Sequence, residues 1–165
     1  MRACELGGLA RRWYAFGGCT FVAEVVLTVA RILIVEDDPL SGRTLAAIVR
    51  NLGYSVDLVT SVTAGLEHLV VESPACIFLD LMLPDGDGAL ILVRARATRS
   101  STRIAVMTAI VDEVRLETLR RLGADRVYSK PVDAMDLIEW IETVMANSSD
   151  QDVRPPDDLP GLHLQ

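Results

Sequence analysis

The chain has 165 residues, of which 50% are hydrophobic, 24% are charged and 5% are aromatic. This composition excludes a collagen-like chain, an intrinsically disordered chain and a disulfide scaffold, and the length favours one domain with appendages. The 16 basic and 23 acidic residues give a net charge of −7, which argues against general binding of nucleic-acid phosphates.

Residues 1–29 are expected to form an N-terminal extension of uncertain structure. Glu24 is the only formal charge between Trp13 and Ala30, so the segment has the apolar character of a signal peptide or membrane anchor. The pair Gly17–Gly18 interrupts this run, and a carboxylate inside a membrane span is unfavourable. We therefore predict an irregular extension and a cytoplasmic protein, with a signal or anchor as the alternative.

Residues 30–146 alternate between a strand period and a helix period five times, which predicts five βα units. The predicted strands are Arg31–Glu36, Ser55–Val59, Ala75–Asp80, Arg103–Thr108 and Arg126–Ser129. Three of them are continuous apolar runs, as in a parallel sheet covered by helices on both faces, whereas the second alternates like an edge strand. This pattern predicts an α/β domain built on a doubly wound five-stranded parallel sheet.

Apolar stripes at helical spacing fill the gaps between these strands. Ser61 or Thr60 is expected to cap the second helix, and Asp133 the last one. Gly53 and Gly123 stand where a left-handed residue ends the first and fourth helices. The stripes of the first, second and last helices are Leu45, Ile48, Val49 and Leu52; Val62, Leu66, Leu69 and Val70; and Leu137, Trp140, Ile141, Val144 and Met145.

Residues 147–165 contain three prolines and four aspartates and few side chains that could be buried. Such a segment cannot offset the entropy lost on ordering, so we expect a disordered acidic, proline-rich tail. Because no second domain is predicted after residue 146, the output is expected to pass through a partner protein.

Chemically reactive side chains gather at the predicted strand ends. Glu36 and Asp37 follow the first strand, Asp80 ends the third, Thr108 ends the fourth and Lys130 follows the fifth. In an open parallel sheet the carboxyl ends of the strands meet at one edge, and ligands bind there. These five residues are therefore expected to form one site.

The residue types at this edge suit phosphoryl transfer. Two carboxylates about 4 Å apart repel by roughly 4 kcal/mol at an effective dielectric constant near 20, so their cluster favours a cation. Carboxylate and carbonyl oxygens are the hard ligands that Mg²⁺ accepts. Asp80 can act as a nucleophile toward phosphorus, while Mg²⁺, Lys130 and Thr108 stabilise the charge on the transferred group.

Four motifs in this order resemble a response-regulator receiver domain of two-component signalling, of the stand-alone type, over residues 31–146. The matching segments are Ile32–Pro39 (ILIVEDDP), Phe78–Gly88 (FLDLMLPDGDG), Met107–Ala109 (MTA) and Ser129–Pro131 (SKP). The resemblance implies a flavodoxin-like fold with strand order 2-1-3-4-5. It also implies a cis bond before Pro131, while Asp85–Gly88 is expected to form a turn.

The resemblance also implies a role for each residue of the site. The phospho-acceptor would be Asp80, with Thr108 and Lys130 contacting the phosphoryl group. The Mg²⁺ ligands would be Asp37 and Asp80 directly, Glu36 through a bound water, and Met82 through its backbone carbonyl. The implied phosphodonor is a histidine kinase or histidine phosphotransferase.

The implied function is that of a phosphoprotein that signals to an unidentified downstream protein, without direct nucleic-acid binding. It would catalyse only its own phosphorylation and dephosphorylation. One alternative is a phosphorylation-independent interaction module. A second is an aspartate-based phosphohydrolase, which generally has an aspartate where this chain has Met82.

One feature departs from the family pattern, and two further residues bear on the lifetime of the phosphoryl group. Val127 stands where the family usually has an aromatic residue that moves inward on phosphorylation, and Tyr128 should point to the opposite face of the sheet. Met82 and Ile110 stand at the positions that flank the path of the hydrolytic water. Because neither apolar side chain orients water, we predict a long-lived phosphoryl group.

Overall fold

Five parallel strands form the central sheet in the order β2-β1-β3-β6-β7. This is the predicted order 2-1-3-4-5, because β4 and β5 belong to a separate two-stranded sheet. The strands of the main sheet are β1 (Arg31–Val35), β2 (Ser55–Val59), β3 (Cys76–Asp80), β6 (Arg103–Thr108) and β7 (Arg126–Ser129). Every neighbouring pair is parallel, so all five carboxyl ends lie at one edge.

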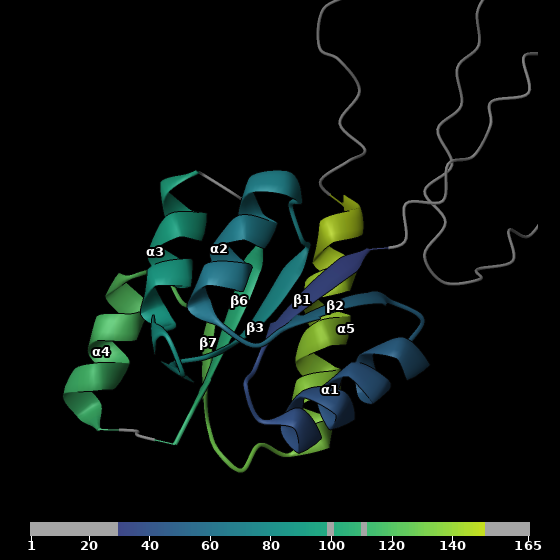
Figure 1. Ribbon diagram of the computed structural model, residues 1–165. Coiled ribbons are helices and arrows are strands. Elements are labelled where there is room, and N and C mark those ends of the chain that lie inside the picture. The colour runs from purple at the N-terminus through teal and green to yellow at the C-terminus, as the bar shows by residue number, and fades with distance from the viewer. Residues whose placement is uncertain (1–29, 99–100, 110–111, 151–165) are drawn as a thin grey trace, which may run out of the picture.

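The computed structural model describes residues 30–98, 101–109 and 112–150 (Figure 1). The predicted extension 1–29 and residues 151–165 of the predicted tail lie outside the described residues. The last helix runs through Asp150, beyond the expected domain boundary at residue 146. Within the described ranges, no helix combines the length and hydropathy that a membrane span requires.

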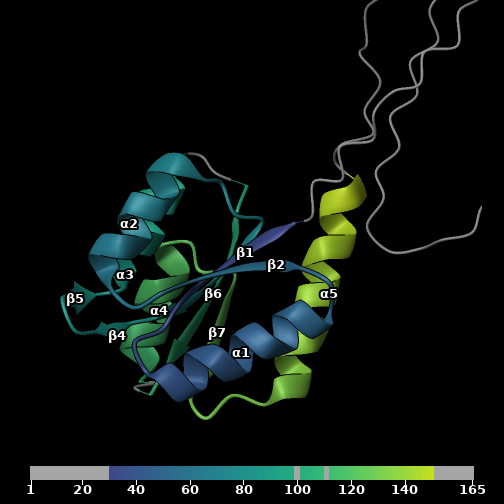
Figure 2. The same ribbon diagram turned by 45° about the vertical axis from the view of Figure 1, so that its right-hand side comes forward.

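Within the part of the chain that the structure describes, five helices cover the two faces of the sheet. They are α1 (Pro39–Asn51), α2 (Val62–Val71), α3 (Ala89–Ala97), α4 (Glu113–Arg121) and α5 (Ala134–Asp150). Helices α1 and α5 lie on one face, while α2, α3 and α4 lie on the other (Figures 1 and 2). The predicted three-layer α/β architecture is confirmed.

The alternation of strand side chains divides the core into two layers. On β1, Leu33 and Val35 pack toward α2, α3 and α4, whereas Ile32 and Ile34 pack toward α1 and α5. All five residues of β3 are buried because β3 is central and covered on both faces. One member of the predicted stripe of α2 was wrongly placed in the core: Val70 is 72% exposed, because it lies on the outer side of that helix.

A short hairpin follows β3. It consists of β4 (Met82–Leu83) and β5 (Gly86–Asp87), paired antiparallel, where the sequence predicted only a turn. Two-residue strands are too short to show a hydrophobic period, so the pairing left no pattern in the sequence. The side chain of Asp85 at its tip accepts hydrogen bonds from the backbone N–H groups of Val62 (2.7 Å) and Thr63 (2.9 Å). The hairpin is thereby fixed to the N-terminus of α2.

The helix ends largely follow the sequence rules. Ser61 caps α2, since its hydroxyl accepts from the backbone of Ala64 at 3.1 Å. Asp133 precedes α5 and accepts from the backbone of Met135 at 2.8 Å. Gly53 (φ 89°) and Gly123 (φ 98°) adopt the expected left-handed conformation after α1 and α4. Asp38 caps α1 by accepting from the Ser41 N–H at 2.8 Å.

Candidate functional site at the carboxyl edge of the sheet

The predicted site residues converge at the carboxyl edge of the sheet. Glu36 directly follows β1, Asp80 ends β3, Thr108 ends β6 and Lys130 directly follows β7. Glu36, Asp80 and Thr108 are 2%, 5% and 2% exposed, respectively. Polar groups are buried in this way only where they have partners. The burial therefore reflects a built cluster rather than isolated surface charges.

Lys130 joins the two buried carboxylates. Its Nζ donates to Asp80 Oδ2 at 2.6 Å and to Glu36 Oε2 at 2.7 Å. Its backbone N–H donates to the Thr108 carbonyl at 2.9 Å, and the following Lys130–Pro131 peptide bond is cis, as expected. Residues far apart in the sequence are thus held together by charge-assisted hydrogen bonds, which are stronger than neutral ones.

Lys130 is also the only lysine in the chain, since the other basic residues are all arginines. This compositional feature singles out the residue without any reference to a motif. A lysine ammonium is a compact point charge, whereas guanidinium is a planar fork. The compact group is able to sit between two carboxylates that approach it from different strands.

Burial and charge act in opposite directions on this cluster. Burial raises the pKa of Glu36 above its ordinary value, and the nearby Lys130 only partly offsets that rise. Burial alone would lower the pKa of Lys130, but its hydrogen bonds to Asp80 and Glu36 outweigh this effect and raise the pKa. Lys130 is therefore held in its charged form, as a partner for negative charge on Asp80 requires.

Three carboxylates of the site fit a divalent cation. Glu36, Asp37 and Asp80 each offer an oxygen, and these oxygens lie within 4.8 Å of one another. Asp37 is exposed while the other two are buried, so the cluster has one side open to solvent. Hard oxygen donors with room for bound waters are what Mg²⁺ prefers. The donor set therefore suits Mg²⁺.

Met82 lies next to the side chain of Asp80. Its backbone N–H donates to Asp80 Oδ1 at 3.0 Å, so the first residue of the hairpin is tied directly to the carboxylate. The contribution of its carbonyl to metal binding stays a prediction. Its side chain is 60% exposed and lines a neighbouring pocket.

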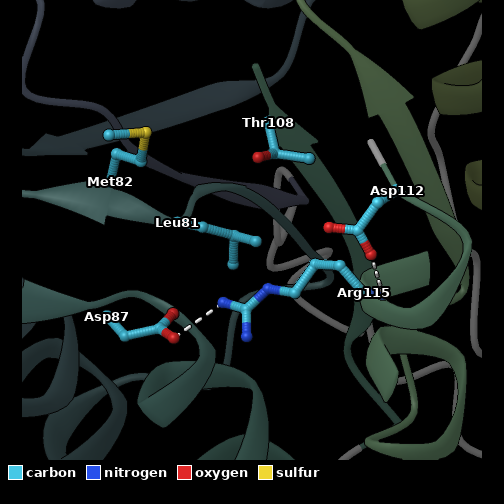
Figure 3. A pocket seen from close by; sticks show the side chains of 6 residues that line it. All are labelled: Leu81, Met82, Asp87, Thr108, Asp112 and Arg115. Atoms are coloured by element: carbon cyan, nitrogen blue, oxygen red, sulfur yellow. Dashed lines mark hydrogen bonds and ion pairs between the residues drawn. The ribbon is translucent and has the colours of Figure 1, made fainter. Parts of the chain in front are cut away.

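This pocket is lined by Leu81 and Met82, the two residues that follow Asp80, and has a volume of about 420 Å³. Figure 3 shows Thr108 and Met82 on one side of it and the long side chain of Arg115 extending from α4 toward Asp87. The six lining residues are Leu81, Met82, Asp87, Thr108, Asp112 and Arg115. Sequence reasoning missed Asp112 and Arg115 as neighbours of the site, because they lie at the start of a helix that carries no motif.

The aromatic side chain of β7 takes the predicted direction. Val127 packs with the core layer under α2, α3 and α4, whereas Tyr128 is buried in the layer under α1 and α5. The Tyr128 hydroxyl donates to the Asp136 carbonyl at 3.2 Å. The expectation that Tyr128 faces the opposite side from Val127 is confirmed.

Comparison with known proteins agrees with this arrangement. The family described as the response regulator receiver domain matches residues 32–142. The chain is 33% identical over 119 residues to the transcriptional regulatory protein DltR of Streptococcus agalactiae serotype III (strain NEM316), covering 72% of this chain and 53% of that protein. It is also 33% identical over 126 residues to the sensory transduction protein RegX3 of Mycobacterium tuberculosis (strain H37Rv), covering 76% and 55%.

Solved structures show the same fold. A CheY-like response regulator receiver domain protein from Methanospirillum hungatei JF-1 superposes with a TM-score of 0.70 at 26% identity, covering 76% of this chain and 99% of that one. The receiver domain of the sensor histidine kinase PA1611 from Pseudomonas aeruginosa PAO1 has a TM-score of 0.65 at 25% identity, covering 72% and 99%. That structure holds a magnesium ion coordinated in its active site cleft.

The fold and the acidic site together define a signalling domain of the two-component class. The chain belongs to the response regulator receiver domain family. It spans about half the length of the curated relatives it matches.

Proposed function

We propose that the chain accepts a phosphoryl group on Asp80 from a histidine kinase or histidine phosphotransferase and signals through altered protein contacts. The observation that carries this proposal is the ammonium of Lys130 placed 2.6 Å from Asp80 and 2.7 Å from Glu36, beside the exposed carboxylate of Asp37. A buried carboxylate that is held by a fixed cation and lies near a solvent-exposed carboxylate is suited to attack phosphorus as a nucleophile.

Each residue has a defined task in this reaction. An Asp80 oxygen forms the new bond to phosphorus as the bond between phosphorus and the donor nitrogen breaks. Lys130 neutralises charge on the phosphoryl oxygens, and the Thr108 hydroxyl donates a hydrogen bond to them. Glu36, Asp37, Asp80 and the Met82 carbonyl would hold Mg²⁺, which supplies further neutralisation of the transferred charge when bound. The catalysis is limited to the chain's own phosphorylation and dephosphorylation.

Two other functions fit less well. A phosphorylation-independent interaction module has no need of two buried carboxylates joined by a lysine, because such an arrangement is costly to desolvate. An aspartate-based phosphohydrolase needs an acid/base group two residues after its nucleophile, and here Met82 offers none. A cytoplasmic location and the absence of direct nucleic-acid binding remain predictions from composition and charge.

The proposal is tested by phosphorylation with a small acyl phosphate in the presence of Mg²⁺. Intact-protein mass spectrometry is expected to show addition of one phosphoryl group to the natural chain and none to the Asp80→Asn variant. The matched control is Asp38→Asn, which keeps a good capping residue before α1 and should be phosphorylated normally. Equal phosphorylation of the Asp80→Asn variant contradicts the assignment, and turnover of phosphate esters by the natural chain favours the phosphohydrolase.

The lifetime of the phosphoryl group is expected to depend on Met82. Its exposed side chain lines the pocket that Thr108 also lines, and an apolar group there can obstruct an attacking water but cannot orient it. Replacing Met82 by asparagine should speed dephosphorylation by about tenfold, which corresponds to roughly 1.4 kcal/mol of barrier. The other residue predicted to act here, Ile110, lies outside the described residues.

Decay of the phosphorylated protein is followed by mass spectrometry after removal of the donor. Met82→Leu is the control, because it keeps an apolar side chain of similar size and should leave the rate unchanged. An asparagine variant that decays no faster than the leucine variant shows that this position does not limit hydrolysis.

A further inference from the structure

An ion pair spans the pocket beside the acceptor. The guanidinium of Arg115, in the first turn of α4, donates to Asp87 Oδ2 on β5 at 2.7 Å (Figure 3). The pair therefore links the hairpin that follows Asp80 to the start of α4.

Both partners are braced by their own surroundings. The other carboxylate oxygen of Asp87 accepts from the Ala89 N–H at 2.9 Å, where α3 begins. The backbone N–H of Arg115 donates to Asp112, the N-cap of α4, at 2.7 Å. Burial raises the pKa of Asp87, but the Ala89 N–H and Arg115 outweigh this and lower it overall. Here both partners of the ion pair are held by further hydrogen bonds. Such a pair restrains the hairpin and the helix that carry it more strongly than a pair between mobile surface side chains does.

A phosphoryl group on Asp80 would change the electrostatics of this pocket. Leu81 and Met82, which directly follow the acceptor, line the pocket together with Thr108 and Arg115. Phosphorylation adds a charge of roughly −1.5 to −2 and three strong acceptor oxygens. The guanidinium of Arg115 lines the pocket formed by the residues that follow the acceptor. It is attracted by the added charge, which competes with the single carboxylate of Asp87.

We propose that the Asp87–Arg115 ion pair is a latch that holds α4 in its position in the unphosphorylated protein, and that a phosphoryl group on Asp80 opens it by drawing Arg115 away. This proposal depends on the phospho-acceptor function proposed above. The latch would carry the effect of phosphorylation from Asp80 to α4, in a chain whose β7 has Val127 in place of the usual aromatic residue.

Beryllofluoride, which occupies the place of a phosphoryl group on a carboxylate, gives a direct test. Calorimetric titration of the full chain in saturating Mg²⁺ should show tighter beryllofluoride binding by about threefold in the Asp87→Asn variant, within the range of measured ion-pair energies. Asparagine keeps the oxygen that accepts from Ala89 but removes the charge that competes for Arg115. Simple destabilisation of the fold would not tighten binding.

Two further variants isolate the ion pair. In an Arg115→Gln background, adding Asp87→Asn should leave the affinity unchanged, because the latch is already absent. Glu117→Gln is the matched control, since it removes the Glu117–Arg121 pair (3.0 Å) within the same helix and should have no effect. Unchanged affinity in the Asp87→Asn variant, or an equal gain in both backgrounds, overturns the latch. Failure of the natural chain to bind beryllofluoride overturns the proposed phospho-acceptor function instead.

Discussion

Replacing Lys130 by methionine is expected to slow phosphorylation of Asp80 by about 100-fold while raising the affinity of the protein for Mg²⁺. The loss of rate has the size found when one preorganised donor to a developing charge is removed. The gain in metal affinity has a different origin. Without the ammonium that lies 2.6 Å from Asp80 and 2.7 Å from Glu36, these two carboxylates repel each other and bind a divalent cation more tightly.

The phosphorylation rate and the Mg²⁺ affinity are expected to change in opposite directions, which makes this prediction specific. Mg²⁺ affinity is measured by calorimetry, and the phosphorylation rate by mass spectrometry with a small acyl phosphate at saturating Mg²⁺. Lys130→Arg serves as the control: it keeps the charge but replaces a compact ammonium by a planar guanidinium, so metal affinity should stay near that of the natural chain. A parallel fall of affinity and rate in the methionine variant would show that Lys130 mainly supports the local fold.

The strands of this protein could be predicted closely because burial on both faces leaves a clear pattern. The continuous apolar run Ile32–Val35 and the run that ends at Asp80 became β1 and β3 with boundaries shifted by at most one residue. Helix capping also depends on residues that are close in the sequence, so Ser61 and Asp133 could be predicted as the residues that cap α2 and α5. Val70 shows the limit of this reasoning, since an apolar residue on a helix is not necessarily on its buried side.

The core of the candidate site was also predictable, for a topological reason. Once the strands are parallel, their carboxyl ends must share an edge, so Glu36, Asp80, Thr108 and Lys130 are brought near one another whatever the details of packing. What this rule does not give is the pairing of individual atoms. That one ammonium contacts both Glu36 and Asp80 depends on side-chain conformations, which appear only in the structure.

The contacts made by the β4–β5 hairpin could not be predicted. Asp85 contacts the N-terminus of α2, and Asp87 contacts Arg115 on α4. Each contact joins residues more than twenty positions apart in the sequence, and neither end carries a repeating pattern. The sequence around Asp85–Gly88 indicates a turn through its glycines, but the direction in which the turn points depends on the helices that surround it.

The glycine that ends this hairpin is expected to be among the residues least tolerant of substitution. Gly88 is buried, and its N–H donates to the Leu81 carbonyl at 2.9 Å. A Cβ atom at this position would lie 2.1 Å from the backbone oxygen of Asp80 and 3.1 Å from the Leu81 Cα. Because these are backbone atoms, they cannot move aside as a flexible side chain could.

We therefore expect Gly88→Ala to lower the free energy of unfolding by about 3–5 kcal/mol, at the upper end of single-substitution effects. Denaturant titration measures this loss. Two other glycine-to-alanine variants serve as comparisons for this loss of stability. Gly53→Ala, at φ +89° with open space around it, should cost only about 1–2 kcal/mol for the left-handed backbone. Gly65→Ala meets the flexible end of Ile91 at 2.5 Å, so it should cost less than Gly88→Ala, within about 1–3 kcal/mol.

The same substitution should affect the chemistry beyond its effect on stability. Any relief of the clash shifts the backbone at Asp80 and Leu81, and with it the carboxylate that Lys130 and the Met82 N–H hold in place. Under conditions where the Gly88→Ala variant remains folded, its phosphorylation rate should therefore be lower than that of Gly53→Ala. Gly88 has an ordinary helical φ of −55°, so equal stability losses for the two variants would show that the added methyl group does not clash with the backbone of Asp80 and Leu81.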